Sequence, residues 1–379
     1  MRIIGLTAEY NPFHRGHAWQ LDRIRERFGT EAAVVAVLSG CFVQRGEPAL
    51  FDARVRAEAA VRCGADLVLE LPLPWAISSA QGFARGAVTV LESLGCVEEL
   101  AFGSETGDPE ELREARRLLE DPGLKPLLRE GLAAGLGFAA ARQQAAERLA
   151  GREVPQLRRR NDILALSYLE ALEGLGSSIR PCPLPRCGEY PPAAQLRERE
   201  DYLSFLPEAA AEVFGREAAA GRGPVRPRDL ELPILAALRT LPESAWEALP
   251  DGGEGLPNRL RRAALEAGSW EELIRLTVTK RYPAARIRRM ALAAFLGLPR
   301  ETAAGAPTYL RVLALSRQGA EVLKNASPRL PVFTKAARGR GDPLMELEQR
   351  AAGLYALAFR EPSERRGDRG WRQSPFIQE

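Results

Sequence analysis

The chain has 379 residues, of which 45% are hydrophobic and 27% are charged, and its formal net charge is +3. This composition is that of a globular protein and excludes a disordered or fibrous one. The length predicts two domains, because a single core rarely organises so many residues. The small net charge does not by itself indicate a polyanionic partner, so local clusters of basic residues decide that question.

The distribution of apolar residues and cysteines excludes membrane and secretory classes. The apolar runs are much shorter than the roughly 20 residues that span a bilayer, and the first residues lack the apolar stretch of an export signal. The five cysteines are scattered and none forms a C-x-x-C pair, which argues against a disulfide framework and against structural zinc. We therefore expect a cytosolic protein without a membrane partner and without protein ligands to a metal.

Short β-branched runs alternate with helical patterns over the first 105 residues. The predicted strands lie at residues 2–7, 32–38, 66–71 and 97–102. The predicted helices lie between them, at residues 17–28, 53–62 and 79–94. This alternation is typical of an α/β fold with a Rossmann-like, doubly wound parallel sheet. Ligands of such sheets bind beyond the carboxyl ends of the strands, where the loops at Thr7, Ser39 and Gly103 would converge.

The remainder of the chain changes character after about residue 200. Helical patterns rich in Ala, Leu and Arg cover residues 108–152, followed by a helix from about residue 161 and a strand at residues 178–184. Beyond residue 201, helical segments are separated by Gly/Pro clusters, without strand alternation until residues 330–333. We therefore predict three parts. They are an α/β catalytic domain at residues 1–200, a mostly α-helical second domain at 201–345, and a C-terminal helix with a mobile charged tail at 346–379.

Both histidines of the protein, His14 and His17, lie in one loop between a predicted strand and a predicted helix. The N-terminus of that helix would point its backbone amides at the edge of the sheet, an arrangement that binds phosphate. Gly16 lets a phosphate approach the backbone, and the spacing of three residues puts both imidazoles on one helix face. Such donors would stabilise the charge that develops on an α-phosphate during adenylyl transfer. The alternative is that His14 is a turn residue and His17 a helix cap.

The sequence EYNPFHRGH at residues 9–17 contains an H-x-G-H signature that resembles the nucleotidyltransferase superfamily. Further segments are similar, in the same order, to the bacterial tRNA(Met) cytidine acetate ligase family. They are SGCFVQRGEPA at residues 39–49, DLVLELP at 66–72, FGSE at 102–105, NDIL at 161–164, TKRYPAARIRR at 279–289 and LRVL at 310–313. The resemblance covers nearly the whole chain, and such an ordered series is much more specific than the four-residue motif.

The resemblance implies a two-step, ATP-dependent ligase reaction. Acetate attacks ATP to give acetyl-adenylate and pyrophosphate, and the wobble cytidine of elongator tRNA(Met) then takes the acetyl group on N4, which yields N4-acetylcytidine. ATP chemistry also implies Mg²⁺ held mostly through phosphates and waters. The mixed anhydride is already activated, so no covalent enzyme intermediate is needed, and Cys41 is expected to pack rather than attack. Glu9 and Glu105 are open candidates for a general base, and each is equally a candidate cap or ribose ligand.

The resemblance also implies which residues of the first domain bind ATP. His14 and His17 are the expected catalytic residues. The expected ATP-binding residues are Thr7, Ala8, Glu9, Tyr10, Asn11, Pro12, Phe13, His14, Arg15, Gly16, His17, Gln20, Gly103, Asn161, Arg186 and Cys187. Two departures from the family pattern concern the phosphates. Ala53 stands where the family has a lysine, with Arg54 or Arg56 as substitutes, and residues 192–194 are Pro-Ala-Ala where hydroxyl residues usually precede Arg197.

A basic cluster around Tyr282 predicts contact between the second domain and RNA. It consists of Lys280, Arg281, Arg286, Arg288 and Arg289. Basic residues with an aromatic among them can grip phosphates and stack an unpaired base, although a solvated helix face is the alternative. A second basic run lies at residues 158–160. With the resemblance, the expected contacts to elongator tRNA(Met) are Arg160, Lys280, Arg281, Arg286 and Arg289.

Two rival functions remain open at this point. One is a nucleotidyltransferase that joins a nucleotide to a small phosphorylated metabolite, which leaves the second domain without a role. The other is a catalytically inert RNA-binding protein that retains the ATP-binding fold. Acetate-dependent pyrophosphate exchange separates the three functions, because the metabolite enzyme would ignore acetate and the inert protein would show no exchange.

Overall fold

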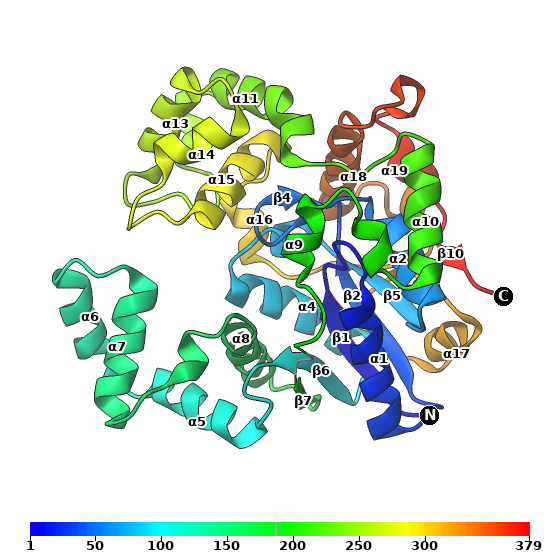
Figure 1. Cartoon of the computed structure of the whole chain (residues 1–379), viewed down its shortest axis with the longest axis horizontal. Coiled ribbons are helices and arrows are strands. Elements are labelled where there is room, and N and C mark those ends of the chain that lie inside the picture. Colours follow the sequence, from blue (N-terminus) through cyan, green and yellow to red (C-terminus); the bar gives the residue numbers. More distant parts are fainter. Residues whose placement is uncertain (186–187) are drawn as a thin grey trace.

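The protein is built around a twisted, mostly parallel sheet (Figure 1), and the computed structural model describes residues 1–185 and 188–379. Neighbouring strands in the order β5-β2-β1-β6-β7 run parallel. Their bounds are Ile3–Ala8 for β1, Ala33–Ser39 for β2, Leu67–Leu71 for β5, Glu99–Ser104 for β6 and Arg180–Pro185 for β7. The predicted strands of this region are confirmed, with ends shifted by one or two residues, and so is the α/β fold class.

Helices cover both faces of the sheet, as in a doubly wound fold. On β1, Ile3 packs toward α4 (Ala80–Leu94) and α8 (Arg160–Gly174), whereas its neighbour Ile4 packs on the opposite face. The helices on that opposite face are α1 (Arg15–Phe28), α2 (Ala53–Arg62) and α10 (Glu208–Ala219). Every residue of β2 is buried, which is expected for a parallel strand covered on both sides.

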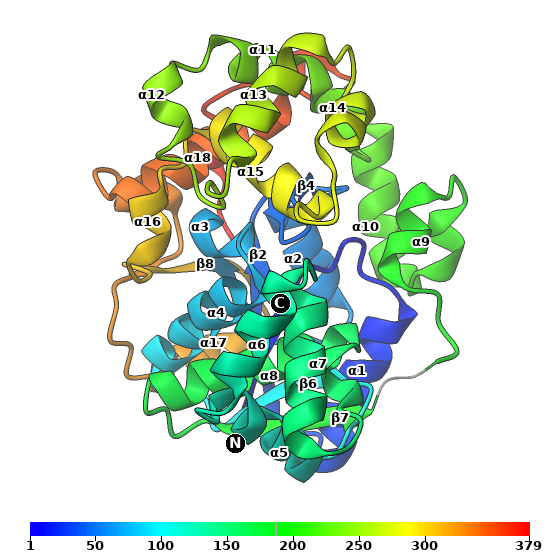
Figure 2. The same ribbon diagram turned by 90° about the vertical axis from the view of Figure 1, so that its left-hand side faces the viewer.

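Two helical lobes extend from the sheet. The first follows β6 and consists of α5 (Pro109–Glu120), α6 (Leu124–Ala133) and α7 (Phe138–Ala150). The second consists of α11 (Glu231–Thr240), α12 (Glu243–Trp246), α13 (Leu256–Glu266), α14 (Trp270–Thr277), α15 (Ala284–Leu296) and α16 (Arg300–Ala304). Figure 2 shows the second lobe above the sheet, with α6 and α7 in front of the sheet and below that lobe.

One strand lies where the sequence predicted only helices. Leu310–Leu315 forms β8, which is buried throughout and pairs antiparallel with β5. The strands β9 (Val332–Phe333) and β10 (Phe376–Ile377) pair with β8 in parallel. A short apolar run has no period that distinguishes strand from helix, and the partner strand β5 lies far upstream. The sequence prediction of helices at residues 310–315 is therefore wrong.

The C-terminal segment packs on the sheet and on the start of α2, contrary to the predicted mobile tail. After α18 (Pro343–Ala356), the short helix α19 (Arg369–Arg372) places Arg369 at 3.7 Å from Asp52. Arg54 Nε donates to the Ser374 carbonyl oxygen at 2.8 Å, and β10 adds to the sheet. The segment has too few apolar residues to form a core of its own, but it packs against the core that the sheet and α2 form.

Several short elements complete the described chain. They are α3 (Leu73–Ala76), α9 (Ala193–Glu198), α17 (Arg317–Asn325) and the hairpin strands β3 (Phe42–Val43) and β4 (Glu47–Pro48). None of the helices in the described residues has the length and apolar character needed to cross a membrane.

Candidate active site

A cavity of about 380 Å³ opens at the carboxyl ends of β1 and β6, beside the N-termini of α1 and α8. We call it the histidine cavity, because His14 and His17 line it. The other expected ATP-binding residues that line it are Thr7, Ala8, Glu9, Tyr10, Asn11, Gly16, Gln20, Gly103 and Asn161. Its position is the one expected for the ligand of a doubly wound sheet, and its volume is typical of small-molecule sites.

Five expected residues are not part of the described cavity wall. Pro12 and Phe13 are buried beneath the loop, where the Phe13 ring contacts the Tyr10 ring edge-on at 4.7 Å between centroids. Arg15, the first residue of α1, is exposed and is not among the residues that line the cavity. Arg186 and Cys187 lie outside the residues that the structure describes.

His14 and His17 form the N-terminal cap of α1. His14 is the N-cap residue, and its Nδ1 accepts a hydrogen bond from the Gly16 amide at 3.0 Å. In return, the His17 Nδ1 accepts a hydrogen bond from the His14 amide at 3.2 Å, which completes a capping box. The two rings also stack, with centroids 3.8 Å apart. Both histidines therefore cap the helix, as the alternative interpretation expects of His17, and the same two side chains also line the cavity.

The cap determines which ring nitrogens carry protons. Because Nδ1 of each histidine is an acceptor, the neutral imidazoles hold their proton on Nε2. Gly16 makes the arrangement possible, since a Cβ at this position would lie 2.9 Å from Cε1 of His14. An anionic group at this end of the cavity would therefore meet two imidazole N–H donors beside the amides of the first helical turn.

Hydrogen bonds between the segment after β6 and the start of α8 fix Asn161 at the opposite wall of the cavity. The Glu105 carboxylate, just after β6, accepts hydrogen bonds from the Asn161 side-chain amide at 2.7 Å and from the Asp162 backbone amide at 3.0 Å. The fully buried Asp162 carboxylate in turn accepts hydrogen bonds from the Ser104 hydroxyl at 2.5 Å and from the Glu105 backbone amide at 3.0 Å. Of the roles left open for Glu105, the structure shows that of a cap, here on α8.

Among the residues that the structure describes, three arginines line the histidine cavity, namely Arg45, Arg160 and Arg197. Arg197 is held against the motif loop, because its Nη1 donates to the Asn11 carbonyl oxygen at 3.2 Å. These cations give the cavity an electrostatic preference for anions. The Pro-Ala-Ala segment at residues 192–194 also lines the cavity, so this departure from the family pattern does lie at the site.

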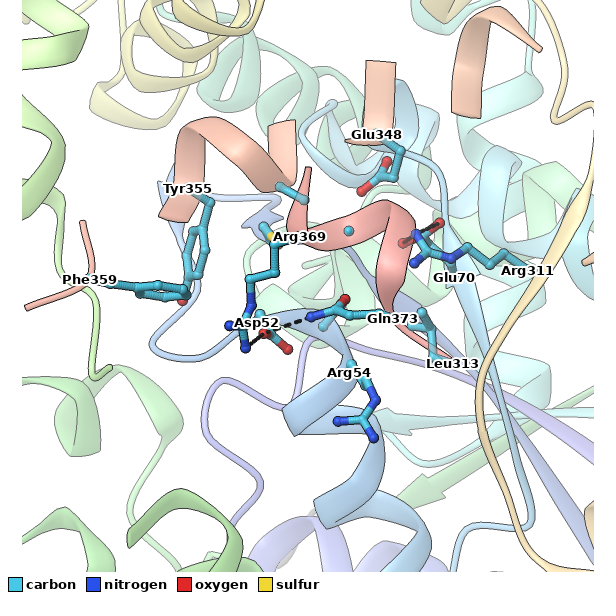
Figure 3. A pocket seen from close by; sticks show the side chains of 14 residues that line it. Asp52, Arg54, Glu70, Arg311, Leu313, Glu348, Tyr355, Phe359, Arg369 and Gln373 are labelled. Atoms are coloured by element: carbon cyan, nitrogen blue, oxygen red, sulfur yellow. Dashed lines mark hydrogen bonds and ion pairs between the residues drawn. The ribbon is translucent and has the colours of Figure 1, made fainter. Parts of the chain in front are cut away.

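Position 53, where the family has a lysine and this chain has Ala53, does not lie at the histidine cavity. Ala53 and Arg54 face a second, much smaller pocket, which Asp52 and Arg369 also line (Figure 3). Ala53 is therefore not part of the histidine cavity, and Arg54 does not replace a phosphate-binding lysine there. That interpretation is wrong because position 53 begins α2 on the side of the C-terminal segment.

Arg56 is not a substitute for the lysine either. Its side chain is fully buried, and its guanidinium donates to the carbonyl oxygens of Glu9, Phe51, Ser39 and Gly40. These carbonyls belong to the loops that follow β1 and β2 and to the segment before α2. Arg56 thus holds the loops at the edge of the sheet together, and it does so without lining the cavity.

Burial shifts the pKa values of Glu9 and Cys41. Burial raises the pKa of Glu9, although Arg197, the Gln44 amide at 3.0 Å and Arg45 oppose this effect. Burial also raises the pKa of the Cys41 thiol, so that this cysteine stays neutral. The packing role predicted for Cys41 agrees with its burial in an apolar cluster.

The β3–β4 hairpin connects the histidine cavity to the second helical lobe. Glu47 forms ion pairs with Arg288 of α15 and, at 3.8 Å, with Arg197 of the cavity wall. At the hairpin tip Gly46 has a φ of 74°, and a Cβ there would lie 2.5 Å from the Arg289 backbone nitrogen. The hairpin therefore packs directly on the start of α15.

The residues expected to contact RNA lie at this same end of α15. Lys280 and Arg281 are exposed, Arg286 pairs with Glu254 at 2.9 Å, and Arg289 pairs with Asp251 at 2.7 Å. Arg160 lies apart from them, in the wall of the histidine cavity. Tyr282 is only 8% exposed, and its hydroxyl donates to the Glu254 carbonyl oxygen. The prediction that Tyr282 stacks an unpaired base is therefore wrong, because its side chain is buried.

Sequence reasoning missed Tyr168 and Arg45 as cavity residues. Tyr168 lies in the interior of α8 and shares a hydrogen bond with the Thr7 hydroxyl, while Arg45 lies in the hairpin. No local pattern indicates either residue, since each reaches the cavity only when distant elements pack together. Trp19 also lines the cavity, and its place near His17 in the first turns of α1 is a signal that could have identified it.

Known proteins resemble this chain over its whole length. Residues 1–369 match the family model described as HIGH Nucleotidyl Transferase. The chain is 35% identical to the tRNA(Met) cytidine acetate ligase of Syntrophomonas wolfei, with 99% of each chain covered, and 36% identical to that of Caldanaerobacter subterraneus, with 95% and 96% covered. The crystal structure of Thermotoga maritima TmcAL bound with alpha-thio ATP is similar at a TM-score of 0.92 and 33% identity, covering 100% of both chains. The chain therefore belongs to the tRNA(Met) cytidine acetate ligase family of HIGH nucleotidyltransferases.

Proposed function

We propose that this protein activates acetate with ATP and transfers the acetyl group to N4 of the wobble cytidine of elongator tRNA(Met). The observation that carries the proposal is the histidine cavity. Two imidazole donors and a helix N-terminus lie in it beside Arg45, Arg160 and Arg197, in a chain that belongs to a family of such ligases. A nucleotidyltransferase for a small metabolite would leave the second helical lobe without a role.

In the first step, a carboxylate oxygen of acetate attacks the α-phosphorus of ATP. The bond from that phosphorus to the bridging oxygen breaks, and pyrophosphate leaves with its electron pair. The Nε2–H groups of His14 and His17 donate to the α-phosphate oxygens, where charge increases in the transition state. Arg45 and Arg197 provide positive charge for the leaving pyrophosphate. Gly103 and Asn161, on the opposite wall, contact the nucleoside.

In the second step, the N4 amine of the cytidine attacks the acetyl carbonyl carbon, AMP leaves, and the amine loses a proton. An unpaired anticodon base can enter a cavity without the cost of leaving a duplex, and close placement is the main requirement. Glu105 is committed to capping α8, so Glu9 is the better candidate to take the proton.

Mg²⁺ enters this proposal as part of the nucleotide. In the described residues, no three or more His, Cys, Asp or Glu side chains are grouped so as to hold a metal ion. The donor set of the cavity is cationic and suits phosphate oxygens. When bound, the ion would neutralise phosphate charge while keeping most of its ligands as phosphate and water oxygens.

The decisive test is incubation of the protein with ATP, labelled acetate and unmodified elongator tRNA(Met), followed by nucleoside analysis. Label in N4-acetylcytidine is the expected result. Labelled acetyl-adenylate without labelled nucleoside would indicate a different acceptor. The absence of both products would contradict the proposal and favour the metabolite enzyme or the inert RNA-binding protein.

We propose that Lys280, Arg281, Arg286 and Arg289 bind the tRNA, together with Arg160 at the cavity. Arg286→Ala should weaken tRNA binding about fivefold and reduce its salt dependence by about one phosphate contact, because a phosphate would replace Glu254 as the partner of Arg286. Filter binding against salt concentration measures both quantities. Arg275→Ala, which removes an arginine paired with Glu272 on α14, is the matched control and should bind as the wild type does.

Glu47→Gln should raise the KM for ATP about fivefold, corresponding to roughly 1 kcal/mol, because Arg197 loses the carboxylate that orients it. Steady-state pyrophosphate exchange at varied ATP gives this KM. Glu47→Asp keeps the charge and should show a smaller effect. An unchanged KM in Glu47→Gln would mean that Asn11 alone positions Arg197.

A further inference from the structure

The segment at residues 124–160 concentrates the positive charge of the protein. It contains eight arginines and lysines and three glutamates, so its net charge is +5, whereas the whole chain has +3. The rest of the molecule is therefore net negative. We call α6, α7 and the residues that lead from them to α8 the α6–α7 lobe. Such a local excess of charge is typical of a surface that meets a polyanion.

Some of this charge is available to a partner. Arg148 pairs with Glu130 at 2.9 Å, and Arg158 pairs with Glu147 at 2.9 Å. By contrast, Lys125 and Arg129 are exposed and form no ion pair within the part of the chain that the structure describes. They lie four residues apart on α6 and therefore share a helix face.

The tip of the lobe is apolar and exposed. At the end of α6 Leu132 is 42% exposed, in the following turn Leu136 is 38% exposed, and at the start of α7 Phe138 is 59% exposed. Phe138 is the most exposed aromatic side chain in the described chain. The Arg142 guanidinium lies over the Phe138 ring, 5.8 Å from its centroid. Burying such a ring against a partner is favourable, and an aromatic ring beside arginine is a common platform for an unpaired base.

The lobe reaches both regions assigned to the tRNA. At its tip, a Cβ on Gly137 would lie 3.3 Å from the Lys280 carbonyl oxygen, so the tip meets the loop before α15. At its base, the segment continues through Arg159 to Arg160 in the wall of the histidine cavity. Figures 1 and 2 show α6 and α7 standing out from the sheet on the side of α14 and α15.

From these observations we infer that the α6–α7 lobe is a second RNA-binding surface, on which Phe138 stacks an unpaired base and Lys125 and Arg129 bind phosphates. This inference rests on the proposed function, because it takes the tRNA as the polyanion. It assigns to Phe138 the stacking role that the buried Tyr282 cannot fill. An RNA partner explains three features together: the positive charge of the lobe, the exposed ring of Phe138 and the connection of the lobe to the histidine cavity.

The test is direct binding of elongator tRNA(Met) to the full chain, measured by fluorescence anisotropy. Phe138→Ala should weaken binding about tenfold, and Phe138→Trp should restore it, because stacking depends on the ring. Lys125→Gln combined with Arg129→Gln should reduce the slope of log K against log salt by about 2. Leu175→Ala removes an exposed leucine at the far end of α8 and should bind as the wild type does.

The outcomes separate this inference from the proposed function. Equal affinity of the wild type and Phe138→Ala for tRNA would overturn the inference, and so would equal loss in Leu175→Ala. A concentration-dependent dimer that Phe138→Ala abolishes would also overturn it, because the tip would then bind a second copy of the chain. Failure of the wild type to bind tRNA at all would instead contradict the proposed function. Acetate-dependent pyrophosphate exchange without tRNA verifies that each variant is folded.

Discussion

His17→Gln should slow acetate-dependent pyrophosphate exchange by about 10²- to 10³-fold, the cost of losing one preorganised donor at an oxyanion. The helix itself should survive the change. His17 is the third residue of α1 and accepts the His14 amide, and glutamine is a usual residue at that position of a capping box. The substitution therefore removes the imidazole and keeps the cap.

His17→Ala is the informative comparison, because it removes both roles. We expect the same loss of exchange, accompanied by about 1 kcal/mol of lost stability from the missing cap. Neither variant should change tRNA affinity, whereas Arg286→Ala should change that affinity alone. Thermal unfolding, exchange kinetics and filter binding measure the three quantities. Retention of exchange in His17→Gln would show that the histidine serves only as a helix cap.

Arg56→Ala should destabilise the protein by about 3–5 kcal/mol, which is at the upper end for a single substitution. The substitution leaves the carbonyl oxygens of Glu9, Phe51, Ser39 and Gly40 without their donor in a buried place. Arg56→Lys should recover only part of the loss, since one ammonium group cannot reproduce the planar fork of donors. The midpoint of urea unfolding is the measurement.

Arg62→Ala is the control for this prediction. Arg62 lies on the same helix, is exposed, and pairs with Glu58 at 3.1 Å. Its loss should cost at most about 1 kcal/mol, as for other solvent-accessible ion pairs. Similar unfolding midpoints for Arg56→Ala and Arg62→Ala would contradict the structural role of Arg56. A loss of exchange in Arg56→Ala without loss of stability would instead place this arginine in the chemistry.

The corrections to the sequence predictions share one cause. The residues concerned make their main contacts with segments that are close in space and distant in the chain. The position of Tyr282 within a basic run predicts a stacking residue, but the side chain is buried under the loop that contains Glu254. Arg56 and Ala53 appeared to border the phosphates, but α2 directs one into the core and the other toward the C-terminal segment.

The amino-acid sequence alone predicts the parallel strands, the helices between them and the position of the H-x-G-H loop. These features depend on the spacing of apolar residues within one segment and on the junction between a strand and the next helix. A single stretch of the chain therefore contains all the information needed to predict them. The three-dimensional packing reveals what the sequence does not predict: β8 joins the sheet, Tyr168 and Arg45 reach the cavity, and Glu47 connects Arg197 to α15. Each of these depends on contacts between segments far apart in the chain, which residue spacing along a single sequence does not record.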